Sequence, residues 1–212
     1  MEVTEFLRQA KSVFWDFDGV IKNSLTVKAD AFEQLFLPFG KDVANQVKRH
    51  HEVNGGMSRY EKLPIYLKWA GRVSSGEIID EFERNFSKLV KQKVIDAEWV
   101  TGVLEYLNSN NPRQNFYLVT ATPQQEIEDI LSALEITHFF NDVIGSPTRK
   151  SKAIRQLIHR DQIIPAQSVM IGDSIVDYNA AIKNEVPFIL RKTDLNKNLQ
   201  SELSCLMIRN FR

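Results

Sequence analysis

The stretch VFWDFDGV, residues 13–20, joins a strongly apolar run to two carboxylates, Asp16 and Asp18, with Gly19 directly behind them. Val, Phe and Trp in such a run are typical of a buried strand. A buried carboxylate costs free energy unless it is paired, so the two acids need a structural partner or a chemical role. We expect them to share one face, because they are two residues apart on a strand, and we expect Gly19 to let the backbone turn away.

Similar apolar runs recur along the chain, and after residue 100 they alternate with amphipathic helical patterns. This alternation predicts an α/β fold in which helices cover the faces of a parallel sheet. Thr122 is expected to cap the first of these helices. The expected strands are residues 12–17, 115–121, 142–145, 168–173 and 187–191, and the expected helices are residues 122–135, 153–160 and 175–184.

Residues 21–95 contain no comparable strand run. Phe32, Leu35 and Phe36 recur at helical spacing, and glycines and prolines interrupt the interval. We therefore expect a small helical domain inserted directly after the first strand. The α/β core would then comprise residues 1–20 and 96–212.

The composition disfavours several classes of protein. The 27 basic and 27 acidic residues leave no basic excess for nucleic-acid binding. Apolar runs fall short of the roughly 20 residues of a membrane span, and the first residues lack the pattern of a signal peptide, so we predict a cytoplasmic protein that binds no membrane. Cys205 is the only cysteine, which excludes an internal disulfide and a thiolate metal cluster. The four histidines suit no single zinc site.

The polar residues that stand out in the expected core follow its strands. Asp16 and Asp18 come after the first strand, Thr120 lies at the end of the second, and Asp173 follows the fourth. In open α/β sheets, ligands bind beyond the carboxyl ends of the strands, so these side chains should meet there. Acids so close together repel one another without a cation. This predicts a divalent metal with oxygen ligands, and magnesium is the common choice where phosphate is also bound.

These motifs resemble those of the haloacid dehalogenase superfamily of phosphatases and phosphomutases. DFDGV matches its first motif, Thr120 in LVTAT its second, a lysine near residue 150 its third, and GDSIVD, residues 172–177, its fourth. The motifs occur in family order over nearly the whole chain, and the resemblance points to the branch of phosphoglycolate phosphatases and β-phosphoglucomutases. It implies a Rossmann-like parallel sheet core with an inserted all-helical cap domain, residues 21–95.

The resemblance also implies a role for each motif residue. Asp16 would attack a phosphoryl group and form an aspartyl phosphate. Asp18 would protonate the leaving alcohol and then activate water, a role that favours a raised pKa. Thr120 and the backbone N–H of Ala121 would hold the phosphoryl oxygens, and Lys150 would offset their negative charge.

A magnesium ion is implied in the same way. Its ligands would be Asp16, the backbone carbonyl of Asp18, and Asp173. Asp177 has two interpretations at this stage: it supports the metal from behind, or it caps the following helix together with Ser174.

The catalytic lysine has two candidates. Lys150 is preferred to Lys152, because it lies four residues before the apolar Ile154 and directly before a possible helix cap at Ser151. Either side chain could instead be a solvated charge at a helix end.

The stretch NGGMSRYEK, residues 54–62, is the part of the expected cap that we assign to substrate binding. Gly55 belongs to a glycine pair that allows close approach of the backbone, and Arg59 could bind a second anionic group of the substrate. The alternative is a plain loop between helices, with Ser58 as the cap of the next helix.

We therefore predict a magnesium-dependent phosphatase that hydrolyses a small phosphorylated metabolite through an aspartyl-phosphate intermediate, with the cap closing over the site. The alternative on the same fold is a phosphomutase acting on a sugar phosphate, in which a second hydroxyl of the sugar takes the phosphoryl group. A signalling receiver domain is disfavoured, because its acceptor aspartate follows a later strand. A regulatory protein on an inactive scaffold is disfavoured by the full set of motif residues. The substrate and the choice between monomer and homodimer stay open.

Overall fold

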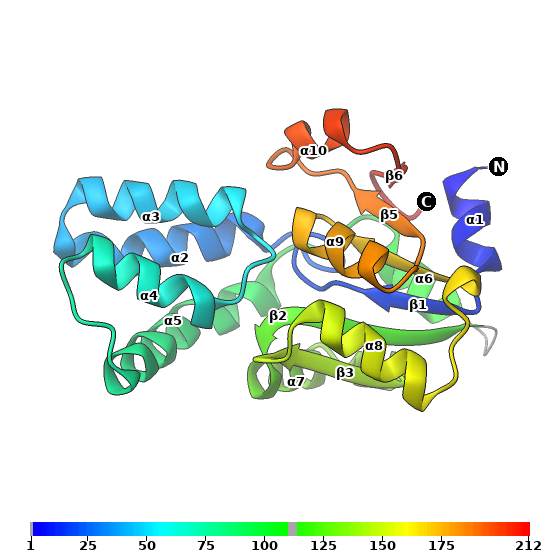
Figure 1. The fold of residues 1–212 in the computed structure, drawn as a ribbon, viewed down its shortest axis with the longest axis horizontal. Helices are drawn as coiled ribbons and strands as arrows, with labels where there is room; N and C mark the ends of the chain where they lie inside the picture. Colours follow the sequence, from blue (N-terminus) through cyan, green and yellow to red (C-terminus); the bar gives the residue numbers. More distant parts are fainter. Residues whose placement is uncertain (1, 110–113) are drawn as a thin grey trace.

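The computed structural model describes residues 2–109 and 114–212. Within these residues, six strands form one sheet in the order β3-β2-β1-β4-β5-β6, and every neighbouring pair is parallel. β1 therefore lies between β2 and β4 (Figure 1). The predicted α/β class with a Rossmann-like parallel sheet is confirmed. The strands are β1 (Ser12–Trp15), β2 (Asn115–Pro123), β3 (Asp142–Ser146), β4 (Ser168–Gly172), β5 (Phe188–Arg191) and β6 (Leu206–Ile208).

Five of these strands overlap the apolar runs of the sequence, with ends that differ by one or two residues, and two further details differ. β6 was not predicted, because its three residues are too few to distinguish a strand from a loop by pattern. β2 continues to Pro123, so the helix after it, α7 (Gln124–Ala133), begins later than expected and has Pro123 rather than Thr122 at its N-cap.

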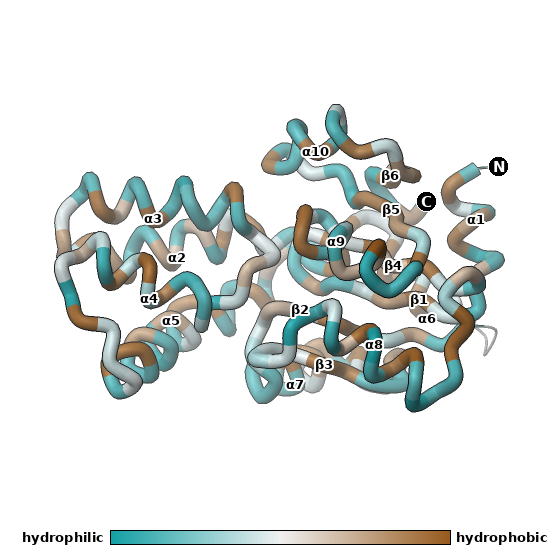
Figure 2. The backbone as a smooth tube through the Cα atoms, in the orientation of Figure 1, coloured by the Kyte–Doolittle hydropathy of each residue, from teal (hydrophilic) through white to brown (hydrophobic). Residues whose placement is uncertain are grey.

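The two faces of the sheet bury alternate residues of each strand. Val13 and Trp15 point to one face of β1, and Phe14 points to the other. Figure 2 shows hydrophobic residues along the strands that the flanking helices cover. The helices on the Phe14 face are α8 (Lys150–Arg160) and α9 (Ile175–Lys183), and those on the Trp15 face are α1 (Val3–Gln9), α6 (Val103–Ser109) and α7.

Residues 25–96 form a helical segment that lies beside the sheet rather than on its faces (Figure 1). Aromatic rings hold it together: the ring centroids of Phe32 and Phe86 are 3.9 Å apart, and those of Phe36 and Tyr66 are 5.7 Å apart. This core explains the helical spacing of its phenylalanines. The helices of the segment are α2 (Leu25–Phe36), η1 (Leu37–Phe39), α3 (Lys41–Val53), α4 (Arg59–Trp69) and α5 (Gly76–Asp96).

The division into a cap of residues 21–95 and a core of residues 1–20 and 96–212 remains a prediction, and Met1 and residues 110–113 of that core lie outside the described residues. Across residues 2–109 and 114–212, no helix combines the length and the apolar character needed to cross a bilayer. The remaining short helices are η2 (Thr137–Phe139), η3 (Pro165–Gln167) and α10 (Lys197–Glu202).

Candidate active site

The carboxyl end of β1 carries Asp16, whose carboxylate is buried beside a lysine. The backbone N–H of Asp16 donates to the carbonyl of Ile171 at 3.0 Å, which extends the pairing of β1 with β4. Lys150, the first residue of α8, has its Nζ 2.8 Å from Oδ1 of Asp16 and 2.5 Å from Oδ1 of Asp177. Burial opposes the ammonium charge, but the two carboxylates raise the pKa of Lys150 above its usual value. Lys152, the other candidate, is exposed on α8.

Three buried carboxylates, two of which are the partners of this lysine, lie close together. Oxygens of Asp16, Asp173 and Asp177 lie within 4.8 Å of one another. Burial raises the pKa of Asp173 well above its usual value, and repulsion from Asp16 and Asp177 adds to the effect. Burial also raises the pKa of Asp16, although Lys150 opposes this. Because one lysine does not balance three carboxylates, the group fits a divalent cation that prefers oxygen ligands, and it could hold a metal ion.

Asp177 caps a helix and also positions the lysine. Its Oδ2 accepts hydrogen bonds from the backbone N–H of Ser174 at 3.1 Å and from the Ser174 hydroxyl at 2.6 Å. The Ser174 hydroxyl oxygen in turn accepts from the backbone N–H of Asp177, which completes a capping box at the start of α9. Oδ1 of Asp177 accepts from Lys150. The helix-cap interpretation is therefore confirmed, and support of a metal remains a prediction.

Asp18 lies beyond Asp16 and faces the helical segment. Its carboxylate accepts hydrogen bonds from Ser24 at 2.6 Å, Lys28 at 2.5 Å and Thr122 at 3.2 Å. Burial alone would raise the pKa of Asp18, but the charge of Lys28 and these three hydrogen bonds lower it below its usual value. The expectation of a raised pKa does not match the structure, because Lys28 stabilises Asp18 as a carboxylate.

Gly19 allows the two halves of the acidic site to approach each other. Its φ of +74° lies in the left-handed region, where side chains with a Cβ are strained. A Cβ at this position would also lie 2.4 Å from Oδ2 of Asp173. The turn expected behind Asp18 therefore needs glycine for two reasons, its backbone conformation and the close approach of Asp173.

Two residues that bind Asp18, Lys28 and Thr122, were not identified from the sequence. Thr122 was expected to cap a helix, but β2 extends past it, and its hydroxyl instead accepts a hydrogen bond from Lys28 at 2.8 Å. Its spacing of two residues from Thr120, on one strand, was a usable signal, because such residues share a face. For Lys28, the signal was a lysine four residues before the buried Phe32, on the apolar face of α2.

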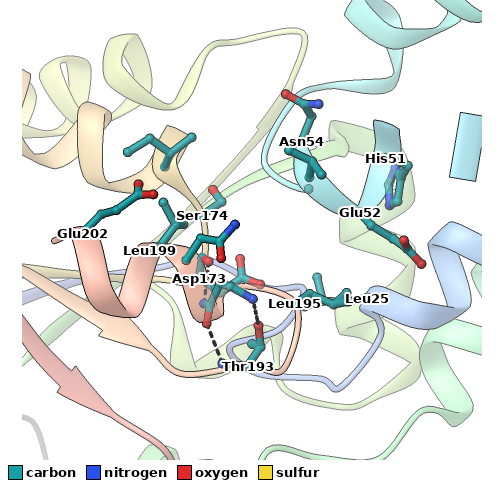
Figure 3. A pocket seen from close by; sticks show the side chains of 15 residues that line it. Leu25, His51, Glu52, Asn54, Asp173, Ser174, Thr193, Leu195, Leu199 and Glu202 are labelled. Carbon is teal, nitrogen blue, oxygen red and sulfur yellow. Dashed lines mark hydrogen bonds between the residues drawn. The ribbon is translucent and has the colours of Figure 1, made fainter. Parts of the chain in front are cut away.

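Two cavities border residues of the site. One of about 670 Å³ lies between the loop before α4 and the core, and Thr120, Ala121 and Lys150 are among its lining residues. The other, of about 340 Å³, borders Asp173. Figure 3 shows the side chain of Asp173 between those of His51 and Glu52 on one side and those of Leu199 and Glu202 on the other. Thr120 is itself buried, and its hydroxyl oxygen accepts from the backbone N–H of Thr122 at 3.2 Å.

Residues 13–190 match the sequence profile of the haloacid dehalogenase-like hydrolases. The chain belongs to this family. It is 26% identical to a phosphoglycolate phosphatase of Vibrio cholerae, over 82% of this chain and 81% of that protein. It is 30% identical to a phosphoglycolate phosphatase of Psychrobacter arcticus, over 78% of this chain and 76% of that protein. The predicted enzyme class, a phosphatase of the haloacid dehalogenase type, is confirmed by these relatives.

The fold is also shared with solved structures. CbbY from Rhodobacter sphaeroides, crystallised in complex with xylulose-(1,5)bisphosphate, superposes with a TM-score of 0.77 over 95% of both chains, at 11% identity. The structural similarity covers 95% of this chain, so it includes both the helical segment and the sheet. Both parts also lie largely within residues 13–190, which match the haloacid dehalogenase-like hydrolases.

In this haloacid dehalogenase-like hydrolase, Arg59 joins the helical segment to the core. Its guanidinium is buried and binds both carboxylate oxygens of Glu126 on α7, at 2.8 and 2.5 Å. It also donates to the hydroxyl of Ser87 at 2.7 Å. Ser58 caps α4 by accepting from the backbone N–H of Tyr60, as the plain-loop interpretation expects. The predicted contact between Arg59 and substrate stays a prediction, and Arg59 has a carboxylate partner within the protein.

The glycine pair before α4 approaches the core through its second member. A Cβ on Gly55 would meet no atom within 4 Å, whereas a Cβ on Gly56 would lie 2.3 Å from Oγ of Ser174 and 2.9 Å from Cβ of Val176. Ser174 follows Asp173, so the loop packs directly beside the acidic site. The close approach expected of the glycine pair is made by Gly56, toward Ser174 of the core, and contact of Gly55 with substrate remains a prediction.

We expect Gly56→Ala to destabilise the protein by about 1–3 kcal/mol, because the added methyl group must displace the loop from Ser174. Gly55→Ala is the matched control, and it should change stability by no more than about 0.5 kcal/mol. Thermal and urea unfolding of the two variants measure the difference. Equal losses of stability in both variants would contradict the packing described here.

Proposed function

We propose that the protein is a magnesium-dependent phosphatase that hydrolyses a small phosphorylated metabolite through an aspartyl phosphate on Asp16. The observation that carries this proposal is the buried Lys150, 2.8 Å from Asp16 and 2.5 Å from Asp177, which are two members of a group of three buried carboxylates. A carboxylate beside a permanent cation and an acidic metal-binding group has the arrangement that nucleophilic phosphoryl transfer requires. Membership of the haloacid dehalogenase-like hydrolases supports the same chemistry.

In the first half of the reaction, a carboxylate oxygen of Asp16 attacks the phosphorus, and the bond from phosphorus to the leaving alcohol breaks. Asp18 donates a proton to the alcohol oxygen as it leaves. Lys150 offsets the charge of Asp16 and the phosphoryl group together, and Thr120 with the N–H of Ala121 holds the phosphoryl oxygens. This half needs a protonated Asp18, so Lys28 must release the Asp18 carboxylate when substrate binds.

In the second half, Asp18 acts as a base. It takes a proton from a water molecule that attacks the phosphorus of the aspartyl phosphate, and the bond to Asp16 breaks, which releases phosphate and restores the Asp16 carboxylate. The charge of Lys28 lowers the pKa of Asp18 and so keeps Asp18 ionised, which is the form that can accept this proton.

The residues present fit a magnesium ion, because carboxylate oxygens of Asp16 and Asp173 converge in a buried acidic group. Asp16, Asp173 and the backbone carbonyl of Asp18 would hold it. When bound, the ion supplies positive charge that stabilises the phosphoryl oxygens. It would also relieve the repulsion that, together with burial, raises the pKa of Asp173.

The proposed substrates are small, because the helical segment, the proposed cap of residues 21–95, packs against the core beside Asp18 and Ser174. The phosphoglycolate phosphatases among the relatives make 2-phosphoglycolate the first compound to test. A cytoplasmic location remains part of the proposal, as does the absence of nucleic-acid and membrane partners.

The test is phosphate release from a panel of short organic-acid phosphates, sugar phosphates and nucleotides. Removal of divalent metal with EDTA should lower the rate by at least about 100-fold, and added Mg²⁺ should restore it. Isomerised sugar phosphates in place of free phosphate would favour the phosphomutase alternative. Absence of release from the whole panel in the presence of Mg²⁺ would contradict a phosphatase, and release that is indifferent to EDTA would contradict the metal site.

A further inference from the structure

The helical segment directs several buried cationic side chains toward Asp18. Lys28, Arg59 and Lys62 line a cavity of about 30 Å³ together with His51 and Asp18. The cations come from two helices, α2 and α4, and all are buried. Such a concentration of buried positive charge is costly unless each cation has a partner.

Two of these cations have carboxylate partners in the protein, and Lys62 does not. Lys28 pairs with Asp18, and Arg59 pairs with Glu126. Lys62 is 1% exposed, and within the part of the chain that the structure describes it has no carboxylate at ion-pair distance. Its Nζ lies 2.9 Å from Nδ1 of His51.

The partner of Lys62 is a neutral imidazole. Burial lowers the pKa of His51 well below its usual value, and the neighbouring lysines lower it further, so Nδ1 accepts a hydrogen bond rather than carrying charge. Burial also lowers the pKa of Lys62 well below its usual value, and Lys28 adds to this. Asp18 and Glu61 oppose this shift, but among the described residues neither is at ion-pair distance from Lys62. Lys62 is thus a buried lysine whose hydrogen-bond partner is a neutral side chain, which is the condition of a site that an anionic ligand completes.

The residues that line the small cavity show where Lys62 lies relative to the proposed phosphoryl site. Ala121, whose N–H we propose to hold the phosphoryl group, lines both this cavity and the 670 Å³ cavity beside Lys150. Asp18, which protonates the leaving oxygen, lines the small cavity as well. The small cavity therefore lies on the leaving-group side of the phosphoryl site, where the organic part of the substrate must extend.

We propose that Lys62, supported by His51, binds the carboxylate of a short substrate in which a chain of one or two carbons separates that carboxylate from the phosphate ester oxygen. The size of the cavity supports a carboxylate, because about 30 Å³ holds only about two water-sized groups. A second phosphate or a sugar ring needs more room. The inference rests on the proposed function and adds its specificity-determining residue.

Arg59 lies three residues before Lys62 on α4, and the sequence singled out Arg59 for the anion-binding role. Its guanidinium is held by Glu126, whereas Lys62 has no such partner. We therefore expect the loss of Lys62 to impair binding of an anionic substrate group, whereas the loss of Arg59 would break its ion pair with Glu126.

The experiment compares two substrates of the protein of residues 1–212 in the presence of Mg²⁺. One is 2-phosphoglycolate, and the other is 2-hydroxyethyl phosphate, in which a neutral CH₂OH group replaces the carboxylate. Lys62→Met should lower the kcat/KM for 2-phosphoglycolate, relative to that for 2-hydroxyethyl phosphate, by at least about 30-fold. The reason is that only 2-phosphoglycolate has a carboxylate that pairs with Lys62. Lys68→Met is the matched control: Lys68 is an exposed lysine on the same helix, and its loss should leave the ratio of the two kcat/KM values unchanged.

A readout of folding accompanies the kinetics. Lys62→Met should keep or raise the melting temperature, because it removes a buried amine that has no carboxylate partner at ion-pair distance among the described residues. A lower melting temperature with equal losses on both substrates would show that Lys62 is structural and would overturn the inference. An unchanged ratio in Lys62→Met, or a native protein that does not distinguish the two compounds, would overturn it as well. If the native protein hydrolyses neither these two compounds nor any other member of the wider panel, the proposed function itself is overturned.

Discussion

Replacing Asp16 by asparagine should abolish phosphate release, with a loss on the order of 10⁴-fold or more, while the fold stays intact. The amide has no carboxylate oxygen to attack phosphorus, so no aspartyl phosphate forms. The shape of the side chain is retained, and Lys150 keeps Asp177 as a buried partner. Burial and the neighbouring acids raise the pKa of Asp16, so a neutral side chain there removes repulsion rather than adding it.

Phosphate release under saturating Mg²⁺ measures the activity of Asp16→Asn, and thermal unfolding measures its fold. Asp80→Asn provides the matched control, because Asp80 is an exposed aspartate on α5 and its loss should leave both quantities unchanged. An Asp16→Asn variant that retains substantial phosphate release would contradict the assignment of Asp16 as the nucleophile. A variant that fails to fold would show that Asp16 is needed for structure.

The second large effect concerns the ion pair between Arg59 and Glu126. We expect Glu126→Gln to lower the free energy of unfolding by about 3 kcal/mol, because it leaves a buried guanidinium without its main counter-charge. Glu83, whose Oε1 is 3.4 Å from Arg59, compensates only in part. Urea unfolding measures the difference, and Glu128→Gln, an exposed glutamate on the same helix, is the matched control. A loss below about 0.5 kcal/mol would contradict the role of this pair in joining the helical segment to the core.

The pH dependence of the same pair has a definite sign. Burial alone would raise the pKa of Glu126, but Arg59 and Ser87 lower it below the usual value of 4.5. A carboxylate whose pKa is lowered by folding contributes stability above its unfolded pKa and loses that contribution as the pH falls through its folded pKa. The difference in unfolding free energy between the native protein and Glu126→Gln should therefore be full at pH 7 and shrink below about pH 4.5. A difference that stays constant down to pH 3 would contradict this.

Most of the sheet was predictable because its information is local. Runs such as residues 13–15 and 169–171 are apolar throughout, which follows from burial on both faces of a parallel sheet. The polar residues that follow these runs, Asp16 and Asp173, then had to meet, since parallel strands place their carboxyl ends along one edge. The sequence by itself therefore determined the class of the fold and the acidic core of the site.

The tertiary structure alone decided which charged side chains of the helical segment face that site. Lys28 and Thr122 are 94 residues apart in sequence, and Arg59 and Glu126 are 67 residues apart. Helical spacing shows that a face of α4 is buried, but it does not say which of Arg59 and Lys62 finds a carboxylate across the interface. That outcome depends on how the helical segment docks on the core. The docking brings Glu126 to Arg59 and leaves Lys62, among the residues that the structure describes, without a carboxylate at ion-pair distance.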